Sequence, residues 1–442
     1  MMEFLCEKTQ VVVLMGGLGT RLGDYTRNCP KPLMDIHGKP FFSYQLEIMK
    51  AAGFRRFLFC LGYRAELIEA YYGDGSAFGV QIQYSYDGEQ LLGTGGAVRK
   101  ALPLLDEDFL MIYGDSFMDI HFFEVLVRYL EGKAKGRPAL MTVMQNGGRY
   151  DKSNVICRDG EILLYDKKTP LPEMDYIDYG VNVFSRSLFE NAQDGVFDLS
   201  DLQSRLSREG LLSCCETERR FYEIGNPGSL AEFREYAGKR WGKPQPAVFL
   251  DRDGVINEIV WNDDIEQLDS PLKPEEFRLL PDVEQALRLL QDKGYLLFVV
   301  TNQPAAAKGK TKYTTLCEIN RQFVKRMRDK GIEMTDVAMC PHYGKKLPQT
   351  KEEYLIRDCE CRKPKPGLIR EICAKYSIDL GRSWMVGDSA TDILCGKQAG
   401  VHTAFIGAFK CDLCRMTGCD KPERTDTDLL SFARAMSETA AG

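Results

Sequence analysis

No stretch of this 442-residue chain approaches the roughly 20 consecutive apolar residues that a membrane span needs. The chain also lacks a basic leader followed by a cleavage site, the features by which a signal peptide is recognised. Positive charge is not in excess: the formal net charge is −6, and nucleic-acid binding depends on Lys and Arg that neutralise backbone phosphates. We therefore expect a cytoplasmic protein with no membrane or nucleic-acid partner.

Cysteine is plentiful, but the 15 cysteines lack the dense spacing of a secreted disulfide framework, so most are expected to be reduced thiols. Internal repeats and coiled-coil heptads are absent, which leaves the oligomeric state open. The length predicts two domains, because a single core rarely grows this large. The alternation of strand and helix patterns is interrupted by a short connection that contains glycine and proline. We therefore predict α/β domains at 1–240 and 241–408 and a tail at 409–442.

A glycine-rich loop follows the first apolar run, residues 11–15, which has the character of a buried parallel strand. Gly16, Gly17 and Gly19 allow the backbone to approach a phosphate and to aim N–H groups at it. Arg21 follows the loop, and Lys31 stands between two prolines, so both cations could meet the same phosphates. The loop has neither the Gly-Lys-Ser/Thr of a Walker motif nor the third glycine of a dinucleotide fingerprint. The spacing therefore indicates another class of nucleotide site.

The motifs GGLGTRL, CPKPL, LLGTGGAV and YGDSF occur in that order, and the order resembles that of sugar-1-phosphate nucleotidyltransferases. The resemblance is closest to the enzymes that act on mannose-type and heptose 1-phosphates, and it covers about residues 9 to 237. It implies a doubly wound, Rossmann-like sheet and nucleotidyl transfer from a nucleoside triphosphate, GTP being favoured, with release of pyrophosphate. Such a reaction has no protein nucleophile, so Mg²⁺ and cationic side chains must stabilise the reacting anions.

The same resemblance assigns roles to individual residues of the first half. The triphosphate and the reacting phosphates would be bound by Gly16, Gly17, Gly19, Thr20, Arg21 and Lys31. Mg²⁺ would be held by Asp115 and Glu223. The base would be bordered by Gly93, Thr94 and Gly96, and the sugar would be contacted by Lys167, Gly180 and Asn182.

The second half opens with Asp251 and Asp253, one residue apart after the apolar run 247–250. Two carboxylates this close suit a divided task, in which one attacks a phosphoryl group and the other handles protons. Their negative pocket also favours Mg²⁺. Two further apolar runs end in Thr301-Asn302 and in Gly387-Asp388, and Arg362-Lys363 lies between them in the sequence.

This pattern resembles the haloacid dehalogenase superfamily of phosphatases over about residues 246 to 408. The resemblance implies a second doubly wound domain with a parallel sheet, in which Asp251 forms an aspartyl-phosphate and Asp253 protonates the leaving alkoxide and later activates water. Mg²⁺ would be bound by Asp251, the main-chain carbonyl of Asp253, and Asp388, with Asp392 in support. Thr301 and Lys363 would hold the transferring phosphoryl group, and Arg362 would recognise the sugar phosphate. Asn302 is a further candidate binding residue.

Four soft ligands in two close pairs, Cys340, His342, Cys359 and Cys361, predict a closed tetrahedral zinc site. The ion would be structural, because the polar segment between the pairs has no core of its own. Thiols that lie close together without a metal are the alternative. The roles of Cys411, Cys414 and Cys419 are left open, since three cysteines without a fourth partner are more typical of ordinary thiols.

A zinc loop of this form narrows the resemblance to the phosphatases of D-glycero-D-manno-heptose 1,7-bisphosphate and of histidinol phosphate. A sugar nucleotidyltransferase needs a 1-phosphate, and removal of the 7-phosphate from the heptose bisphosphate supplies one. We therefore predict a bifunctional enzyme of nucleotide-activated heptose synthesis with small-molecule substrates. Two alternatives stay open: both activities on another phosphosugar, and a histidinol-phosphate-type phosphatase whose other half only binds. The sequence also leaves open which anomer of the sugar and which nucleoside triphosphate are used, and whether the intermediate is channelled between the two active sites.

Overall fold

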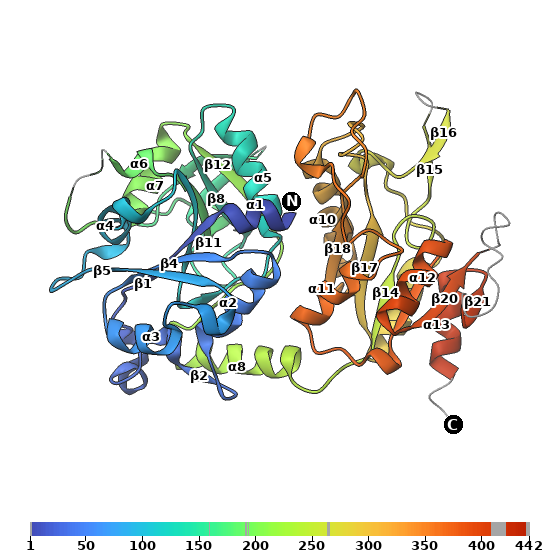
Figure 1. The fold of residues 1–442 in the computed structure, drawn as a ribbon, viewed down its shortest axis with the longest axis horizontal. Coiled ribbons are helices and arrows are strands. Elements are labelled where there is room, and N and C mark those ends of the chain that lie inside the picture. The colour runs from blue at the N-terminus through green and yellow to red at the C-terminus, as the bar shows by residue number, and fades with distance from the viewer. Residues whose placement is uncertain are drawn as a thin grey trace. The chain divides into compact units, whose positions relative to one another are not determined.

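In the computed structural model the chain divides into two compact units, Met1–Gly238 and Lys239–Gly442, and each is considered by itself (Figure 1). The structure describes residues 2–158, 160–190, 192, 194–262, 266–407 and 421–438. Cys411, Cys414 and Cys419 lie outside these ranges. Among the described residues, no helix combines the length and the apolar character needed to cross a membrane.

The first unit alternates strands with helices and 3-10 turns. Its elements are α1 (Met2–Lys8), β1 (Gln10–Met15), η1 (Thr20–Thr26), η2 (Lys31–Leu33), β2 (Asp35–Ile36), β3 (Lys39–Pro40), α2 (Phe41–Ala51), β4 (Arg56–Leu61), α3 (Ala65–Tyr72), η3 (Ser76–Phe78), β5 (Gln81–Tyr86), α4 (Gly93–Lys100), η4 (Leu102–Leu104), β6 (Asp108–Tyr113), β7 (Ser116–Phe117), α5 (Phe122–Lys133), β8 (Ala139–Gln145), β9 (Val155–Arg158), β10 (Glu161–Tyr165), β11 (Tyr176–Ser185), α6 (Ser187–Glu190), α7 (Leu199–Arg208), β12 (Leu212–Thr217), β13 (Tyr222–Glu223) and α8 (Pro227–Trp241).

A nine-stranded sheet forms the centre of this unit, in the order β5-β4-β1-β6-β11-β8-β12-β10-β9. The strands β5, β4, β1 and β6 are parallel, as a doubly wound sheet requires. From β11 onward the sheet is mixed, because β11 runs antiparallel to both β6 and β8. The fully doubly wound sheet predicted from the sequence is thus found only in the first four strands. β9 also pairs with β11, so that β11, β8, β12, β10 and β9 close on one another in a ring, called here the five-strand ring.

The second unit has a simpler strand and helix alternation. Its elements are β14 (Ala247–Leu250), β15 (Val260–Asn262), β16 (Gln267–Asp269), η5 (Pro274–Glu276), α9 (Val283–Asp292), β17 (Leu296–Asn302), α10 (Tyr313–Asp329), β18 (Asp336–Cys340), η6 (Glu353–Leu355), α11 (Gly367–Lys375), η7 (Leu380–Arg382), β19 (Trp384–Gly387), α12 (Ala390–Ala399), β20 (His402–Ile406), β21 (Arg424–Asp426) and α13 (Leu429–Glu438).

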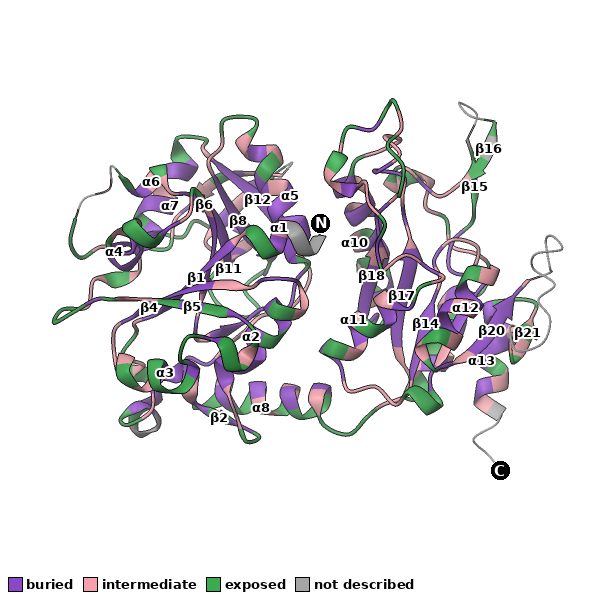
Figure 2. Cartoon of the chain, viewed as in Figure 1, coloured by how far each residue is buried: buried purple, intermediate pink, exposed green. Residues whose placement is uncertain are grey.

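Its sheet has six parallel strands in the order β18-β17-β14-β19-β20-β21, which confirms the predicted parallel sheet. Both faces are covered, as parallel sheets require. Val248 and Leu250 of β14 join a core formed with α9, α10 and α13, while Ala247 and Phe249 join a second core with α11. Figure 2 shows the resulting buried strands in purple between helices whose outer sides are exposed.

The described part of the C-terminal segment belongs to this unit. β21 pairs with β20, and α13 packs against α9. The predicted boundary at 408 therefore differs from the structure, because Leu429, Phe432 and Ala433 are buried in the core of the second unit. The sequence pattern predicts an amphipathic helix at 428–436, and the helix found there is Leu429–Glu438.

Candidate active sites

In the second unit three strand ends bring polar side chains to one edge of the sheet. Asp251 follows β14, Thr301 and Asn302 end β17, and Asp388 follows β19. β17 and β19 are the parallel neighbours of β14, so the carboxyl ends of all three strands meet at the same edge. The structure therefore brings together three motifs, of which the first and the last, Asp251 and Asp388, lie more than a hundred residues apart in the sequence.

Lys363 connects the carboxylates of this site. Its Nζ lies 2.7 Å from Asp251 Oδ1 and 2.6 Å from Asp392 Oδ1, and it donates a hydrogen bond to the main-chain oxygen of Val300 at 2.8 Å. Burial alone would lower the pKa of Lys363, but Asp251 and Asp392 raise it above its ordinary value. The buried ammonium group is thus held in its charged form.

Asp251, Asp388 and Asp392 each offer a carboxylate oxygen within 4.8 Å of the others. Burial, followed by the charge of Asp392, raises the pKa of Asp251 to about 7, and Lys363 opposes this shift. Asp392 also caps α12, since its Oδ2 accepts hydrogen bonds from the N–H and the hydroxyl of Ser389. Clustered hard oxygens of this kind fit a divalent cation such as Mg²⁺.

Asp253 is held by donors that sequence reasoning did not identify. Its Oδ1 accepts hydrogen bonds from Asn257 Nδ2 at 2.9 Å and from Arg252 Nη2 at 3.1 Å, and its Oδ2 accepts one from Gln303 Nε2 at 2.5 Å. Burial would raise the pKa of Asp253, but Arg252, Asn257 and Gln303 lower it below its usual value. Arg252 is fully buried and also donates to Asn320. The sequence shows Arg252 between the two aspartates but not that its side chain turns inward.

Asn302 positions Lys363. Its Nδ2 donates to the main-chain oxygen of Lys363 at 3.1 Å, and its Oδ1 accepts from the Lys363 N–H at 3.0 Å. The side chain predicted as a binding residue thus uses both of its polar groups on the protein. Thr301 is buried, with its hydroxyl bonded to Gln303, and Arg362 donates to the main-chain oxygen of His342 at 3.3 Å.

Gly254 is required for the approach of Asp388. Its φ is +85°, and a Cβ at this position would lie 2.3 Å from Asp388 Oδ2. A larger residue would displace the carboxylate from the cluster.

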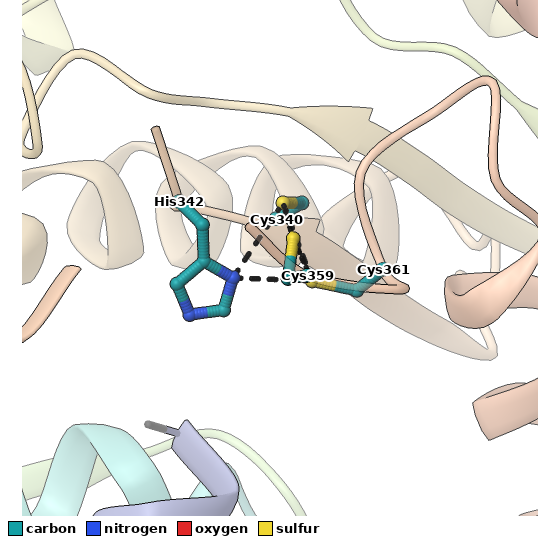
Figure 3. A group of neighbouring side chains, drawn as sticks. All are labelled: Cys340, His342, Cys359 and Cys361. Carbon is teal, nitrogen blue, oxygen red and sulfur yellow. Dashed lines mark hydrogen bonds between the residues drawn. The ribbon is translucent and has the colours of Figure 1, made fainter. Parts of the chain in front are cut away.

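The predicted cysteine and histidine ligands converge in the second unit (Figure 3). The three sulfurs lie 3.3 to 3.6 Å apart, and His342 Nδ1 is 3.2 Å from Cys361 Sγ and 3.8 Å from Cys340 Sγ. Two sulfurs on a tetrahedral zinc ion would be about 3.8 Å apart, because each Zn–S bond is about 2.3 Å long. The donor set and its spacing therefore fit zinc, and Cys361 directly precedes Arg362 and Lys363.

In the first unit, each predicted carboxylate ligand is paired with a predicted phosphate-binding cation. Lys31 Nζ lies 2.7 Å from Asp115 Oδ2, and Arg21 Nη2 lies 3.1 Å from Glu223 Oε1. Glu223 on β13 is in register with Ser116 on β7, the residue after Asp115. This short two-stranded ribbon therefore places Glu223 next to the segment that carries Asp115, beyond the end of β6.

The glycine-rich loop connects β1 to η1 next to these groups. Gly19 has φ +66°, and a Cβ there would lie 2.8 Å from Thr26 and 3.3 Å from the Lys31 side chain. Gly16 accepts a hydrogen bond from the N–H of Tyr63 through its carbonyl. Thr20 begins η1 and is exposed, and at Gly17 a Cβ would meet nothing within 4 Å. The predicted phosphate-binding loop is thus exposed at Gly17 and Thr20, and its Gly19 lies close to the Lys31 side chain.

The predicted base-binding motif has a second role in packing. The N–H groups of Gly95 and Gly96 donate to Phe197 O, and a Cβ at Gly93 would lie 2.6 Å from the same oxygen. Thr94 Oγ1 accepts a hydrogen bond from Leu199 N at 2.8 Å. The start of α4 is therefore fixed against the residues that precede α7, a contact that the sequence does not reveal.

Lys167, Gly180 and Asn182 lie on or beside β10 and β11, and Asp178, which we did not single out from the sequence, joins them. Gly180, with φ +90°, donates its N–H to Asp178 Oδ1 at 2.9 Å, where the register of β11 shifts. Burial raises the pKa of Asp178, and Lys167 lowers it. Asn182 is fully buried and accepts a hydrogen bond from Gln203, so it supports the site from inside.

Comparison with known families shows which classes of enzyme these sites define. The nucleotidyl transferase family model matches residues 10–263, and a HAD-hydrolase-like model matches residues 360–413. A D-glycero-beta-D-manno-heptose-1,7-bisphosphate 7-phosphatase of Rhodopseudomonas palustris is 35% identical over 157 residues, which are 36% of this chain and 81% of that protein. A D-glycero-alpha-D-manno-heptose-1,7-bisphosphate 7-phosphatase of Photorhabdus laumondii is 37% identical over 161 residues, 36% of this chain and 80% of that protein.

A D-glycero-alpha-D-manno-heptose 1-phosphate guanylyltransferase of Campylobacter jejuni is 28% identical over 225 residues, 51% of this chain and 98% of that protein. The chain therefore belongs to the nucleotidyl transferase family and, in its second half, to the family of heptose bisphosphate phosphatases. It is an enzyme that combines a nucleotidyltransferase with a phosphatase. Both resemblances drawn from the sequence are confirmed.

Proposed function

We propose that the second unit removes the 7-phosphate of D-glycero-D-manno-heptose 1,7-bisphosphate and that the first unit transfers a nucleotide to the heptose 1-phosphate so formed. The observation that supports the phosphatase step is the cluster of Asp251, Lys363, Asp388 and Asp392 at the end of the parallel sheet. We take the sugar from the names of the relatives, since relatives of both halves are named as enzymes of heptose phosphates. GTP is the favoured donor because the relative of the first half is named a guanylyltransferase.

In the phosphatase reaction, a carboxylate oxygen of Asp251 attacks the phosphorus while the bond to the heptose oxygen breaks, which leaves an aspartyl-phosphate. Asp253, whose pKa is lowered in the free protein, would take up a proton as the anionic substrate phosphate binds and give it to the leaving alkoxide. It would then take a proton from the water that hydrolyses the acyl phosphate. Arg252, Asn257 and Gln303 orient Asp253 for both steps. Lys363, which contacts Asp251 at 2.7 Å, would turn one N–H towards a phosphoryl oxygen when the substrate binds.

Mg²⁺ would be held by Asp251, the main-chain carbonyl of Asp253, and Asp388, and it would offset the repulsion between carboxylate and phosphate. Zinc would be held by Cys340, His342, Cys359 and Cys361, which fixes the chain just before Arg362 and Lys363. Removal of one ligand in Cys361→Ser should then reduce the zinc content from one ion per chain to none, as measured on the purified protein. Full retention of zinc in this variant would contradict the assignment.

In the transferase reaction, an oxygen of the heptose 1-phosphate attacks the α-phosphorus of the nucleoside triphosphate, and the bond to the pyrophosphate leaving group breaks. Arg21 and Lys31 would stabilise the phosphate charges, and Asp115 and Glu223 would hold Mg²⁺. Lys167, together with Asp178 and Gly180, would contact the sugar phosphate, and the start of α4 would border the base.

A crossed pair of variants tests both halves in the same chain. Asp251→Asn should abolish phosphate release from the heptose 1,7-bisphosphate and leave pyrophosphate release from heptose 1-phosphate and GTP unchanged. Asp115→Asn should have the opposite effect. A folded wild-type protein that releases no phosphate from this substrate would refute the proposed sugar, and pyrophosphate release measured with each of the four nucleoside triphosphates identifies the base.

A further inference from the structure

Two buried cysteines face each other inside the five-strand ring of the first unit. Cys157 on β9 and Cys214 on β12 are 6% and 3% exposed, and their sulfurs lie 2.6 Å apart. Non-bonded carbon atoms prefer a separation of about 3.5–4.0 Å, and sulfur is larger than carbon. The two thiols are therefore closer than an ordinary packing contact allows.

The ring brings these strands together although β10 lies between them in the sheet order. Cys157 is in register with Ile162 on β10, and the N–H of Cys214 donates to Gly160 in the turn of the same hairpin. β9 returns to β11 through the pair Tyr176 and Val155. Because the ring closes in this way, side chains from β9 and β12 point into one interior.

A metal site explains the arrangement less well than a covalent bond. Glu216 Oε1 is 3.9 Å from Cys157 Sγ and supplies a third donor atom. Two thiolates on one tetrahedral ion would nevertheless stand about 3.8 Å apart, and the sulfurs of the Cys340 cluster in this same chain are separated by 3.3 to 3.6 Å. Both cysteines are free in this structure, and at 2.6 Å their sulfurs are closer than two ligands of one ion would be, as expected for thiols that can react with each other.

We propose that Cys157 and Cys214 are a thiol–disulfide modification site that links β9 to β12. The oxidant is a low-molecular-weight disulfide such as oxidised glutathione. One protein thiolate attacks it, forms a mixed disulfide and releases one small thiol, and the second protein thiolate then attacks the protein sulfur and releases the other. The two cysteines lose two protons and two electrons, and the small disulfide becomes two thiols.

The link would act on the strands that carry the predicted sugar-binding residues. β10 ends at Tyr165, two residues before Lys167, and β11 contains Asp178 and Gly180. A bond between β9 and β12 fixes the hairpin of β9 and β10 on the ring. Because a cross-link restricts the unfolded chain, the oxidised form is the more stable form of the first unit.

The reaction is slow in the folded protein. The hydrogen bond to Cys157 and burial raise the pKa of Cys214 well above its ordinary value, and the attacking species is the thiolate. Local opening of the β9 and β10 hairpin therefore precedes oxidation. A urea concentration below the unfolding transition accelerates it.

The test uses the full chain with zinc bound, equilibrated with excess oxidised glutathione with and without mild urea. The protein is then unfolded in an alkylating reagent and mapped by mass spectrometry. We expect the peptides of Cys157 and Cys214 to be recovered as a linked pair, lighter than their sum by two hydrogen atoms. Cys157→Ala and Cys214→Ala each abolish the link, whereas Cys215→Ala, the neighbouring position on β12, retains it.

Complete alkylation of both residues under both conditions overturns the proposal, and this result from the wild-type protein does not depend on whether a variant folds. A second metal ion per chain that Cys157→Ala removes, with the Cys340 cluster still loaded, also overturns it in favour of a metal site. Thermal unfolding tests the stabilising role: the oxidised wild type should unfold at a higher temperature than the reduced form, and Cys214→Ala should show no difference. An unchanged midpoint in a linked protein would refute that role.

Discussion

Replacement of Lys363 by Met tests how the phosphatase site is held together. The substitution removes the ammonium group that contacts Asp251 at 2.7 Å and Asp392 at 2.6 Å, and it leaves both carboxylates in a buried position. Removal of one partner from a buried ion pair costs about 3–5 kcal/mol. For a unit of this size, each kcal/mol lowers the midpoint by about 2–4 °C, so we expect a decrease of about 6–20 °C for the second unit.

Lys365→Met is the matched control, two residues along the chain. Lys365 pairs with Glu360 at 2.9 Å, but the two side chains are 47% and 80% exposed. Exposed pairs contribute about 0–1 kcal/mol, so the control should unfold close to the wild type. Calorimetry without added magnesium measures both variants, since the two units can unfold in separate transitions.

Asp392→Asn introduced with Lys363→Met should restore part of the stability, because it removes one of the two carboxylates that lost their partner. Phosphate release should fall to background in Lys363→Met, while pyrophosphate release by the first unit is retained. Equal midpoints for Lys363→Met and Lys365→Met would show that the buried ammonium is not what balances Asp251 and Asp392.

Two smaller changes probe the same unit. Gly254→Ala places a Cβ 2.3 Å from Asp388 Oδ2 and should reduce phosphate release at least tenfold. Gly294→Ala is the control, because Gly294 has a similar φ of +82° but open space around it, and it should leave phosphate release unchanged. Equal activities of the two variants would contradict this role of Gly254. The hydrogen bond to Glu423 raises the pKa of His402 in the folded protein. The charged histidine therefore stabilises the fold fully at a pH below its pKa in the unfolded chain, about 6.5, and this stabilisation is lost as the pH rises through the higher pKa of the folded state. His402→Gln should therefore destabilise the protein at about pH 5.5, by under ~1 kcal/mol, and have less effect at about pH 9, as measured from urea midpoints; an effect that grows with pH would refute this sign.

The strand ends of the phosphatase site could be predicted from the sequence because a buried parallel strand is an apolar run, and Asp251, Thr301 and Asp388 each stand where such a run stops. Parallel neighbours then bring the three positions to one edge of the sheet. The ligands of the zinc cluster could be predicted for a similar reason, since their spacing in the sequence already limits how far apart they can lie.

Side-chain direction could not be predicted in the same way. Nothing in the sequence shows that Arg252 turns inward to hold Asp253, or that Asn302 bonds to the main chain of Lys363. These contacts depend on tertiary structure rather than on local pattern. The mixed half of the first sheet was missed for a related reason. β11 is buried along most of its length although it contains Asp178 and Asn182, and a buried strand does not show from its sequence whether it is parallel or antiparallel to its neighbour.

The two proposed phosphate sites differ in how their charges are balanced. In the second unit, the buried Lys363 contacts two carboxylates at once, so the balance is internal to the protein. In the first unit, Lys31 pairs with Asp115, and the largely exposed Arg21 pairs with Glu223, one cation to one carboxylate. Each of those pairs joins a residue proposed to meet phosphate with one proposed to meet Mg²⁺. Binding of a metal–triphosphate complex would therefore replace two protein ion pairs by cation–phosphate and carboxylate–metal contacts, so that no charge in the first site loses its partner.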